Sequence, residues 1–186
     1  MFLFVGLGNP TPNSENNRHN IGFKIIDAIN FKFKLSKQKP KFKGLLTTGN
    51  INEKKVYAIK PLTFMNNSGI CIRELLEYFK MHSNDVIVFH DDLDIDCGKI
   101  KAKVGGSDAG HNGIASIDKF IGKEYSRVRV GIGKPDSKIS TSDYVLGNFN
   151  EEEKEKLDKL TEDIIESISI LIDKKLDLFS STVNNK

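Results

Sequence analysis

One histidine, His19, occupies a position suited to proton transfer. It lies between Arg18 and Asn20, directly before a stretch whose apolar residues recur at helical spacing. An imidazole at the start of a helix can stay partly exposed to a substrate, and its ordinary pKa of about 6.5 suits general base catalysis. A plain helix N-terminus, capped by Asn17 or Asn20, explains the same residues equally well.

A dense acidic segment, residues 91–96, follows a buried strand and suggests a metal site. An EF-hand loop beginning at Asp92 would need Gly at its sixth position and Glu at its twelfth, but the chain has Cys and Lys there. This excludes the calcium loop, whereas a magnesium site on one or two carboxylates and a solvated acidic turn stay open. We expect instead that Asp91, near the strand end, accepts a hydrogen bond from His19 and orients it.

Two polar segments carry amides that could hold a peptide backbone. Asn66 stands where a core helix would prefer Leu, and an amide offers both donors and an acceptor. Glycines in segment 105–113 permit close approach of the backbone to a ligand and surround His111 and Asn112. A loop capped by Ser68 would explain the first segment, and a linker would explain most of the second.

Two runs of basic residues alternate along predicted strands. Alternation places the side chains of a run on one face of a strand, so the two runs together could present cations to phosphates. A solvated strand face explains either run alone. The runs are Lys99, Lys101 and Lys103, then Arg127, Arg129, Lys134 and Lys138.

The composition is that of an ordinary globular domain, with 186 residues, 38% hydrophobic and 28% charged. The net charge of +3 does not by itself indicate nucleic-acid binding. Two distant cysteines predict free thiols in a reducing compartment. We find neither a signal peptide nor a membrane span, and we predict a cytoplasmic protein. The dinucleotide fingerprint, the P-loop, the Gly-x-Ser-x-Gly elbow and the HExxH motif are absent.

The elements that must position these residues alternate between strands and helices, which predicts one α/β domain over residues 1–186. A solvated connection is expected over 32–43. From residue 151 a single apolar stripe predicts an amphipathic helix to about 178, followed by a frayed tail. Strands are predicted at 2–5, 45–51, 55–59, 86–89, 100–104 and 126–132, and helices at 20–29, 68–79 and near 112.

Seven ordered blocks of the chain resemble bacterial peptidyl-tRNA hydrolases. They are GLGNP, RHNIGF, KPLTFMNNSG, DDLDIDCGKIKAKVGG, GHNGIASI, RVRVGIGKP and YVLGNF, and they run from Gly6 to Phe149. The resemblance implies a twisted mixed sheet between helices and no metal. We expect no cofactor, and nothing in the sequence demands more than a monomer. It also implies hydrolysis of the ester between a peptide and the terminal ribose of tRNA, which would recycle the tRNA.

The same resemblance implies a role for each site residue. His19 would deprotonate the attacking water while Asp91 orients the imidazole. The implied residues are His19, Asp91 and Asn9 for catalysis; Asn66, Asn112, Met65, His111 and Asn20 for substrate binding; and Lys103, Arg129, Lys134 and Lys138 for tRNA binding.

The chain also departs from the family pattern. The family usually has Gly, Tyr and Thr where Thr11, Ser14 and Asn17 stand, so an aromatic ring near the expected RNA end is missing. Residues 107–109 interrupt a glycine run, and Asp108 adds negative charge beside the expected RNA path. The residues implied in the chemistry are all present, so we expect an active enzyme with weaker substrate affinity.

Three other functions compete with this hypothesis. A non-catalytic RNA-binding module would bind tRNA without turnover. A metal-dependent phosphoesterase built on Asp91, Asp92 and Asp94 would lose its activity to a chelator. A broader acyl-ester hydrolase would differ only in its leaving group.

Overall fold

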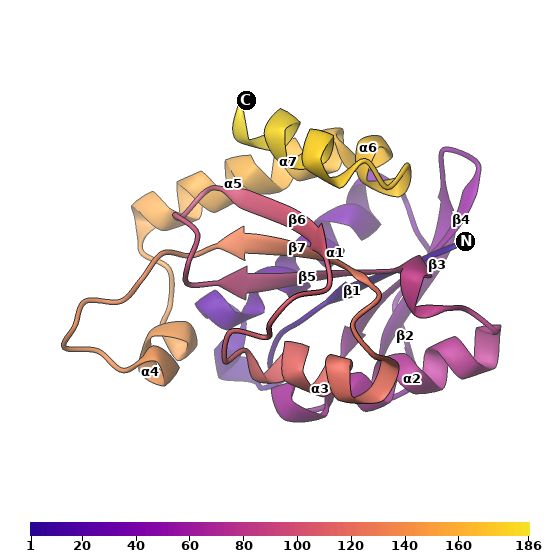
Figure 1. The fold of residues 1–186 in the computed structure, drawn as a ribbon, viewed down its shortest axis with the longest axis horizontal. Coiled ribbons are helices and arrows are strands. Elements are labelled where there is room, and N and C mark those ends of the chain that lie inside the picture. Colours follow the sequence, from indigo (N-terminus) through magenta and orange to yellow (C-terminus); the bar gives the residue numbers. More distant parts are fainter.

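A seven-stranded mixed sheet forms the centre of the molecule, and helices cover both of its faces (Figure 1). The computed structural model describes every residue from Met1 to Lys186. The strand order is β2-β3-β4-β1-β5-β7-β6. This architecture confirms the predicted fold class.

Four parallel strands form the middle of the sheet, and two of them, β1 and β5, are buried along their whole length. Their continuous apolar runs are typical of strands covered on both faces. β3 and β6 are antiparallel to their parallel-strand neighbours, and β2 pairs antiparallel with β3. The strands are β1 (Phe2–Gly6), β2 (Lys39–Lys41), β3 (Gly44–Ile51), β4 (Lys54–Pro61), β5 (Val86–Asp92), β6 (Ile100–Val104) and β7 (Ser126–Gly131).

The helices form two layers, and each encloses a hydrophobic core against the sheet. α1, α5, α6 and α7 cover one face, and α2 and α3 cover the other. The helices are α1 (Ile21–Lys32), α2 (Ser68–Phe79), α3 (Asn112–Ile121), α4 (Thr141–Leu146), α5 (Glu151–Glu166), α6 (Ile168–Ile172) and α7 (Leu176–Asn184), with short 3-10 turns η1 (Pro12–Ser14), η2 (Arg18–Asn20), η3 (Met65–Asn67) and η4 (Ser83–Asp85). No helix is long and apolar enough to cross a bilayer.

Two glycines allow α1 to lie directly on the sheet. A Cβ on Gly22 would lie 2.4 Å from the nitrogen of Leu7 and 2.5 Å from the carbonyl oxygen of Phe89. A Cβ on Gly6 would lie 2.2 Å from the carbonyl oxygen of Gly22. Only hydrogen atoms fit at these two positions, so the start of α1 is held against the ends of β1 and β5.

The predicted single helix over residues 151–178 is wrong in its continuity, because three helices stand there. α5 ends at Glu166, with Ser167 as its C-cap, and a second break follows α6 at Lys174, whose φ of +59° lies in the left-handed region. The apolar stripe continues across both breaks, since each short helix presents its apolar residues to the same core.

The predicted frayed tail is also wrong. Phe179 and Val183 of α7 are buried, and two polar residues of this helix bind the open edge of β6. Ser180 Oγ accepts a hydrogen bond from the nitrogen of Ala102 at 2.8 Å. The Asn184 amide pairs with both the nitrogen and the carbonyl oxygen of Ile100, each at 2.9 Å. α7 thus satisfies backbone groups that an edge strand leaves unpaired.

Candidate active site

A cavity of about 630 Å³ opens where β1 and β5 end, which is where the sequence predicted a site. Its walls come from the loop after β1, from η2 and η3, from the segment 108–112 and from α4. Among the predicted site residues, those that line it are Asn9, His19, Met65, Asp91, His111 and Asn112.

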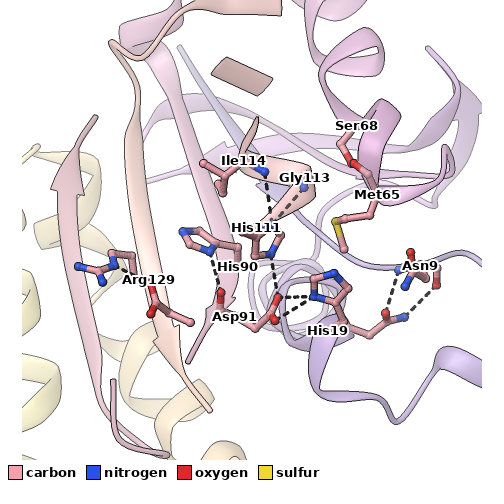
Figure 2. Close-up of polar contacts among 12 residues, drawn as sticks. Asn9, His19, Met65, Ser68, His90, Asp91, His111, Gly113, Ile114 and Arg129 are labelled. Atoms are coloured by element: carbon pink, nitrogen blue, oxygen red, sulfur yellow. Dashed lines mark hydrogen bonds and ion pairs between the residues drawn. The ribbon is translucent and has the colours of Figure 1, made fainter. Parts of the chain in front are cut away.

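His19 and Asp91 form the predicted pair at the floor of this cavity (Figure 2). His19 Nδ1 lies 2.9 Å from each carboxylate oxygen of Asp91, and both residues are buried. A carboxylate only accepts, so Nδ1 carries a proton, and in the neutral imidazole Nε2 is then the nitrogen with the lone pair. Burial acts to raise the pKa of Asp91, but the imidazoles of His111 and His19 hold it well below its usual range. Asp91 is therefore an anion that orients His19.

His111 shares the same carboxylate, which sequence reasoning missed. Its Nε2 donates to Asp91 Oδ1 at 2.9 Å, and its Nδ1 accepts from the nitrogens of Gly113 and Ile114 at 3.1 and 3.3 Å (Figure 2). His111 is thus the N-cap of α3, a position usually held by Ser, Thr, Asp or Asn. These bonds select its neutral tautomer and connect α3 to the carboxylate.

A third imidazole, that of His90, lies behind the other two, and sequence reasoning also missed it. Its Nδ1 donates to the carbonyl oxygen of Asp91 at 2.8 Å, while its buried Nε2 has no partner. Burial, and after it the neighbouring His111 imidazole, lowers the pKa of His90 to about 3. His90 is therefore neutral and supports the backbone at Asp91.

Asn20 does not line the cavity, contrary to the role that the resemblance implied. Its buried amide donates to the carbonyl oxygen of Asn9 at 2.9 Å and accepts from the nitrogen of Asn9 at 2.8 Å. Asn20 thereby pins the Asn9 backbone and leaves the Asn9 side chain at the cavity. Asn66 is exposed on η3 and also lies outside the cavity lining.

Arg18 connects the turn that carries His19 to α4, the helix that forms one wall of the cavity. Its guanidinium pairs with Glu153 at 2.9 Å, donates to the carbonyl oxygen of Tyr144 at 3.2 Å, and lies 4.1 Å from the centre of the Tyr144 ring. Both partners of the ion pair are largely buried. The sequence placed Arg18 beside the base but did not indicate this link.

The acidic segment does not converge on a shared ion. Asp92 accepts from Arg129 Nε at 2.7 Å, and half-exposed Asp94 lies 3.3 Å from Lys134. Ligand atoms of His19, Asp91 and His111 do lie within 4.8 Å of one another. A metal there would need an unprotonated Nε2 on His111, but the Nδ1 that would then carry the proton faces two backbone N–H donors. This donor set fits a hydrogen-bonded triad better than a metal centre.

The predicted cationic surface is only partly formed. Arg127 is buried and pairs with Asp118 at 2.7 Å, so it cannot face phosphates. Arg129 is turned toward Asp92, and Lys138 is exposed. Lys103 packs over Gly106, and desolvation together with the charges of Arg129, Arg127 and Lys101 lowers its pKa.

Comparison with known proteins identifies one family. The family model described as peptidyl-tRNA hydrolase matches residues 3–186. A peptidyl-tRNA hydrolase of Pelagibacter ubique is 75% identical over 186 residues, with 100% of both chains covered. One from Bacillus subtilis is 41% identical and covers 94% of this chain and 93% of its own. A crystal structure of peptidyl-tRNA hydrolase from Acinetobacter baumannii has a TM-score of 0.92 at 32% identity, covering 99% of this chain and 94% of its own.

Proposed function

This chain belongs to the peptidyl-tRNA hydrolase family, and from that premise we propose how its residues carry out the reaction. It is a carboxylic-ester hydrolase that acts on the ester bond of peptidyl-tRNA. His19 is the general base. The observation that carries this assignment is the 2.9 Å contact of His19 Nδ1 with the buried Asp91 carboxylate, which leaves Nε2 unprotonated beside the cavity.

The reaction begins when His19 Nε2 removes a proton from a water molecule in the cavity. The oxygen of this water attacks the ester carbonyl carbon, and Asp91 stabilises the imidazolium that forms. Amide donors of Asn9 and Asn112 face the negative charge on the carbonyl oxygen. The tetrahedral intermediate then collapses, the ribose oxygen leaves and takes the proton from His19, and the peptide departs with a free carboxyl group.

The two ends of the substrate meet different surfaces. The peptide lies in the cavity along Met65 and His111, where the mixed apolar and polar lining accepts many sequences. Phosphates of the tRNA meet lysines that the family resemblance indicates. Lys134 and Lys138 are exposed, and Lys134 lies 3.3 Å from Asp94 of the cavity lining, whereas Lys103 is half-buried. Such contacts do not depend on base sequence, so the enzyme recycles any tRNA. We propose further that it acts as a monomer in the cytoplasm.

The first experiment compares N-acetylated aminoacyl-tRNA with unblocked aminoacyl-tRNA in excess EDTA. The wild-type enzyme should release only the blocked amino acid. His19→Ala should lower kcat by about 10²- to 10⁴-fold, since that is the usual contribution of a general base. The matched control is His82→Ala, because His82 is exposed just before the start of β5, whereas the cavity lies at the other end of this strand, so the variant should keep full activity.

Two outcomes would contradict this mechanism. Full activity of His19→Ala would show that His19 is not the general base. Loss of wild-type activity in EDTA would move the chemistry to a metal held by the acidic segment.

A further inference from the structure

The positive charge of this chain is concentrated in one segment, residues 31–43, here called the lysine segment. It contains six lysines and no Asp or Glu. Elsewhere the chain has 22 basic residues against 25 acidic ones, so the rest of the molecule is net negative. The overall charge of +3 therefore arises from a segment that follows α1 and includes the edge strand β2.

The lysines of this segment are available to a partner. All six are exposed, and only Lys43 forms an ion pair, with Glu74. The ammonium of Lys41 lies 4.2 Å from the centre of the Tyr78 ring, and Tyr78 itself is 62% exposed. The others are Lys32, Lys34, Lys37 and Lys39.

Part of the lysine segment lies at the same end of the sheet as the catalytic centre. Lys41 pairs with Gly44 of β3, and Gly44 pairs with Pro61 of β4. Ile59 of β4 lies opposite Val5 of β1, so Pro61, two residues on, is level with Leu7. Lys41 is therefore level with Leu7, which follows the end of β1 and precedes Asn9 by two positions. Three strand spacings, or about 14 Å, separate β2 from β1.

Cations therefore stand on both sides of the catalytic centre. β7 and β6, with Lys103 on β6, lie beyond β5 in the sheet, and β2 lies beyond β4 in the opposite direction (Figure 1). A polyanion whose end enters the cavity between β1 and β5 would pass over one of these sides or both.

Protection of an edge strand is the simplest alternative explanation for these lysines. Charged residues and proline on an edge prevent pairing with a second sheet. Lys39, Pro40 and Lys41 already supply that protection to β2. The other four lysines lie outside the strand, and edge protection gives no reason for the lack of any acidic residue among them.

We propose that the lysine segment is a second tRNA-binding surface, which holds phosphates of the tRNA body on the β2 side of the catalytic centre. This inference rests on the proposed function, which places the terminal ribose beside His19. Lysines bind phosphate as point charges, so the surface takes any tRNA. It also offsets Asp108, which lines the cavity and would repel the RNA.

The test compares Lys39→Gln/Lys41→Gln with Lys174→Gln/Lys175→Gln, which removes the same charge from the exposed turn between α6 and α7. Each is assayed with N-acetyl-aminoacyl-tRNA and with the same acyl group on a CCA trinucleotide. For the full substrate, the first variant should raise KM about tenfold at constant kcat. Its plot of log(kcat/KM) against log[salt] should become shallower by about 1.5. The trinucleotide ester should be cleaved as by wild type.

Several outcomes would overturn the proposal. They are an unchanged KM for the full substrate, an equal change in the Lys174/Lys175 variant, or an equal loss with the trinucleotide ester. Weaker binding to anionic phospholipid vesicles with unchanged binding to uncharged tRNA would assign the lysine segment to a membrane surface instead. Failure of the wild-type enzyme to cleave either substrate would concern the proposed function and not this surface.

Discussion

A single carboxylate, that of Asp91, accepts hydrogen bonds from two imidazoles that are held in different ways. His19 is presented by a 3-10 turn and keeps one nitrogen at the cavity, whereas both nitrogens of His111 are engaged. The two imidazoles are therefore not equivalent, and only His19 can take a proton without breaking a cap. His111 therefore helps to fix the carboxylate of Asp91, and that carboxylate orients His19, the base.

At the scale of single residues, the free energy of unfolding should depend on pH because of His90. The pKa of His90 is about 3 in the folded protein and about 6.5 for a histidine in the unfolded chain, so the unfolded chain binds more protons between those two pH values. Stability therefore falls as the pH falls from 6.5 toward 3, by about 1 kcal/mol at pH 5.5 from this residue alone. Urea unfolding of wild type and His90→Gln at pH 7.5 and 5.5 measures the difference.

The control for this prediction is His82→Gln, because His82 is exposed. Wild type and this control should lose about 1 kcal/mol more than His90→Gln on going from pH 7.5 to 5.5. Parallel losses in all three proteins would mean that His90 is not the source.

Residue types suggested the pairing of His19 with Asp91 but left a capped helix start and a solvated acidic turn open, and the family resemblance favoured the pair. They did not predict the second bond of Asp91 to His111, nor that Asn20 pins a backbone instead of facing the cavity. Those outcomes depend on side-chain direction within turns. A spacing pattern carries no information about which way a cap or an amide points.

At the scale of elements, the distance between His19 and Asp91 depends on how closely α1 approaches the sheet. Gly22→Ala would place a methyl group against the backbone of Leu7 and Phe89, so α1 must move outward. We expect a loss of about 1–3 kcal/mol of stability. We also expect a fall in kcat much larger than that of the control variant, Gly49→Ala. Thermal or urea unfolding and steady-state kinetics measure the two effects.

A matched control is Gly49→Ala on β3. Its added methyl group would lie 2.6 Å from Leu35 Cδ2, the flexible end of a side chain, and no closer than 3.5 Å to the backbone of Leu35. If both variants keep wild-type kcat, the contact of Gly22 with the sheet does not set the geometry of the catalytic pair.

The buried strands of the sheet could be predicted, since their apolar runs are continuous. β2 could not, because its three residues are all exposed and its pairing with β3 is made by backbone groups alone. The breaks after α5 and α6 escaped prediction for a different reason. Hydrophobic periodicity records which residues face the core, and the core accepts three short helices as readily as one long one.

At the scale of the whole molecule, α7 closes one edge of the sheet. Removing residues 180–186 would delete Ser180 and Asn184, which make three hydrogen bonds to the backbone of β6, and would expose apolar surface. We expect a loss of about 2–4 kcal/mol and concentration-dependent aggregation. Urea unfolding and light scattering are the measurements.

A shorter deletion that removes only Asn185 and Lys186 serves as the control. It breaks one exposed ion pair, with Glu166, so it should change stability by less than about 1 kcal/mol. Monomeric, fully stable protein after removal of residues 180–186 would show that β6 needs no cover.

The clasp of α7 on β6 has a consequence for how this protein is made. Its binding residues lie in α7, which follows all seven strands along the chain, so the edge of β6 stays open until α7 has been translated. A ribosome that stalls before α7 would carry a chain that is still esterified to tRNA and has all the strands of the sheet but not the helix that covers the edge of β6. Such an unfinished copy is itself a peptidyl-tRNA, so finished molecules of the enzyme could release the failed products of their own gene.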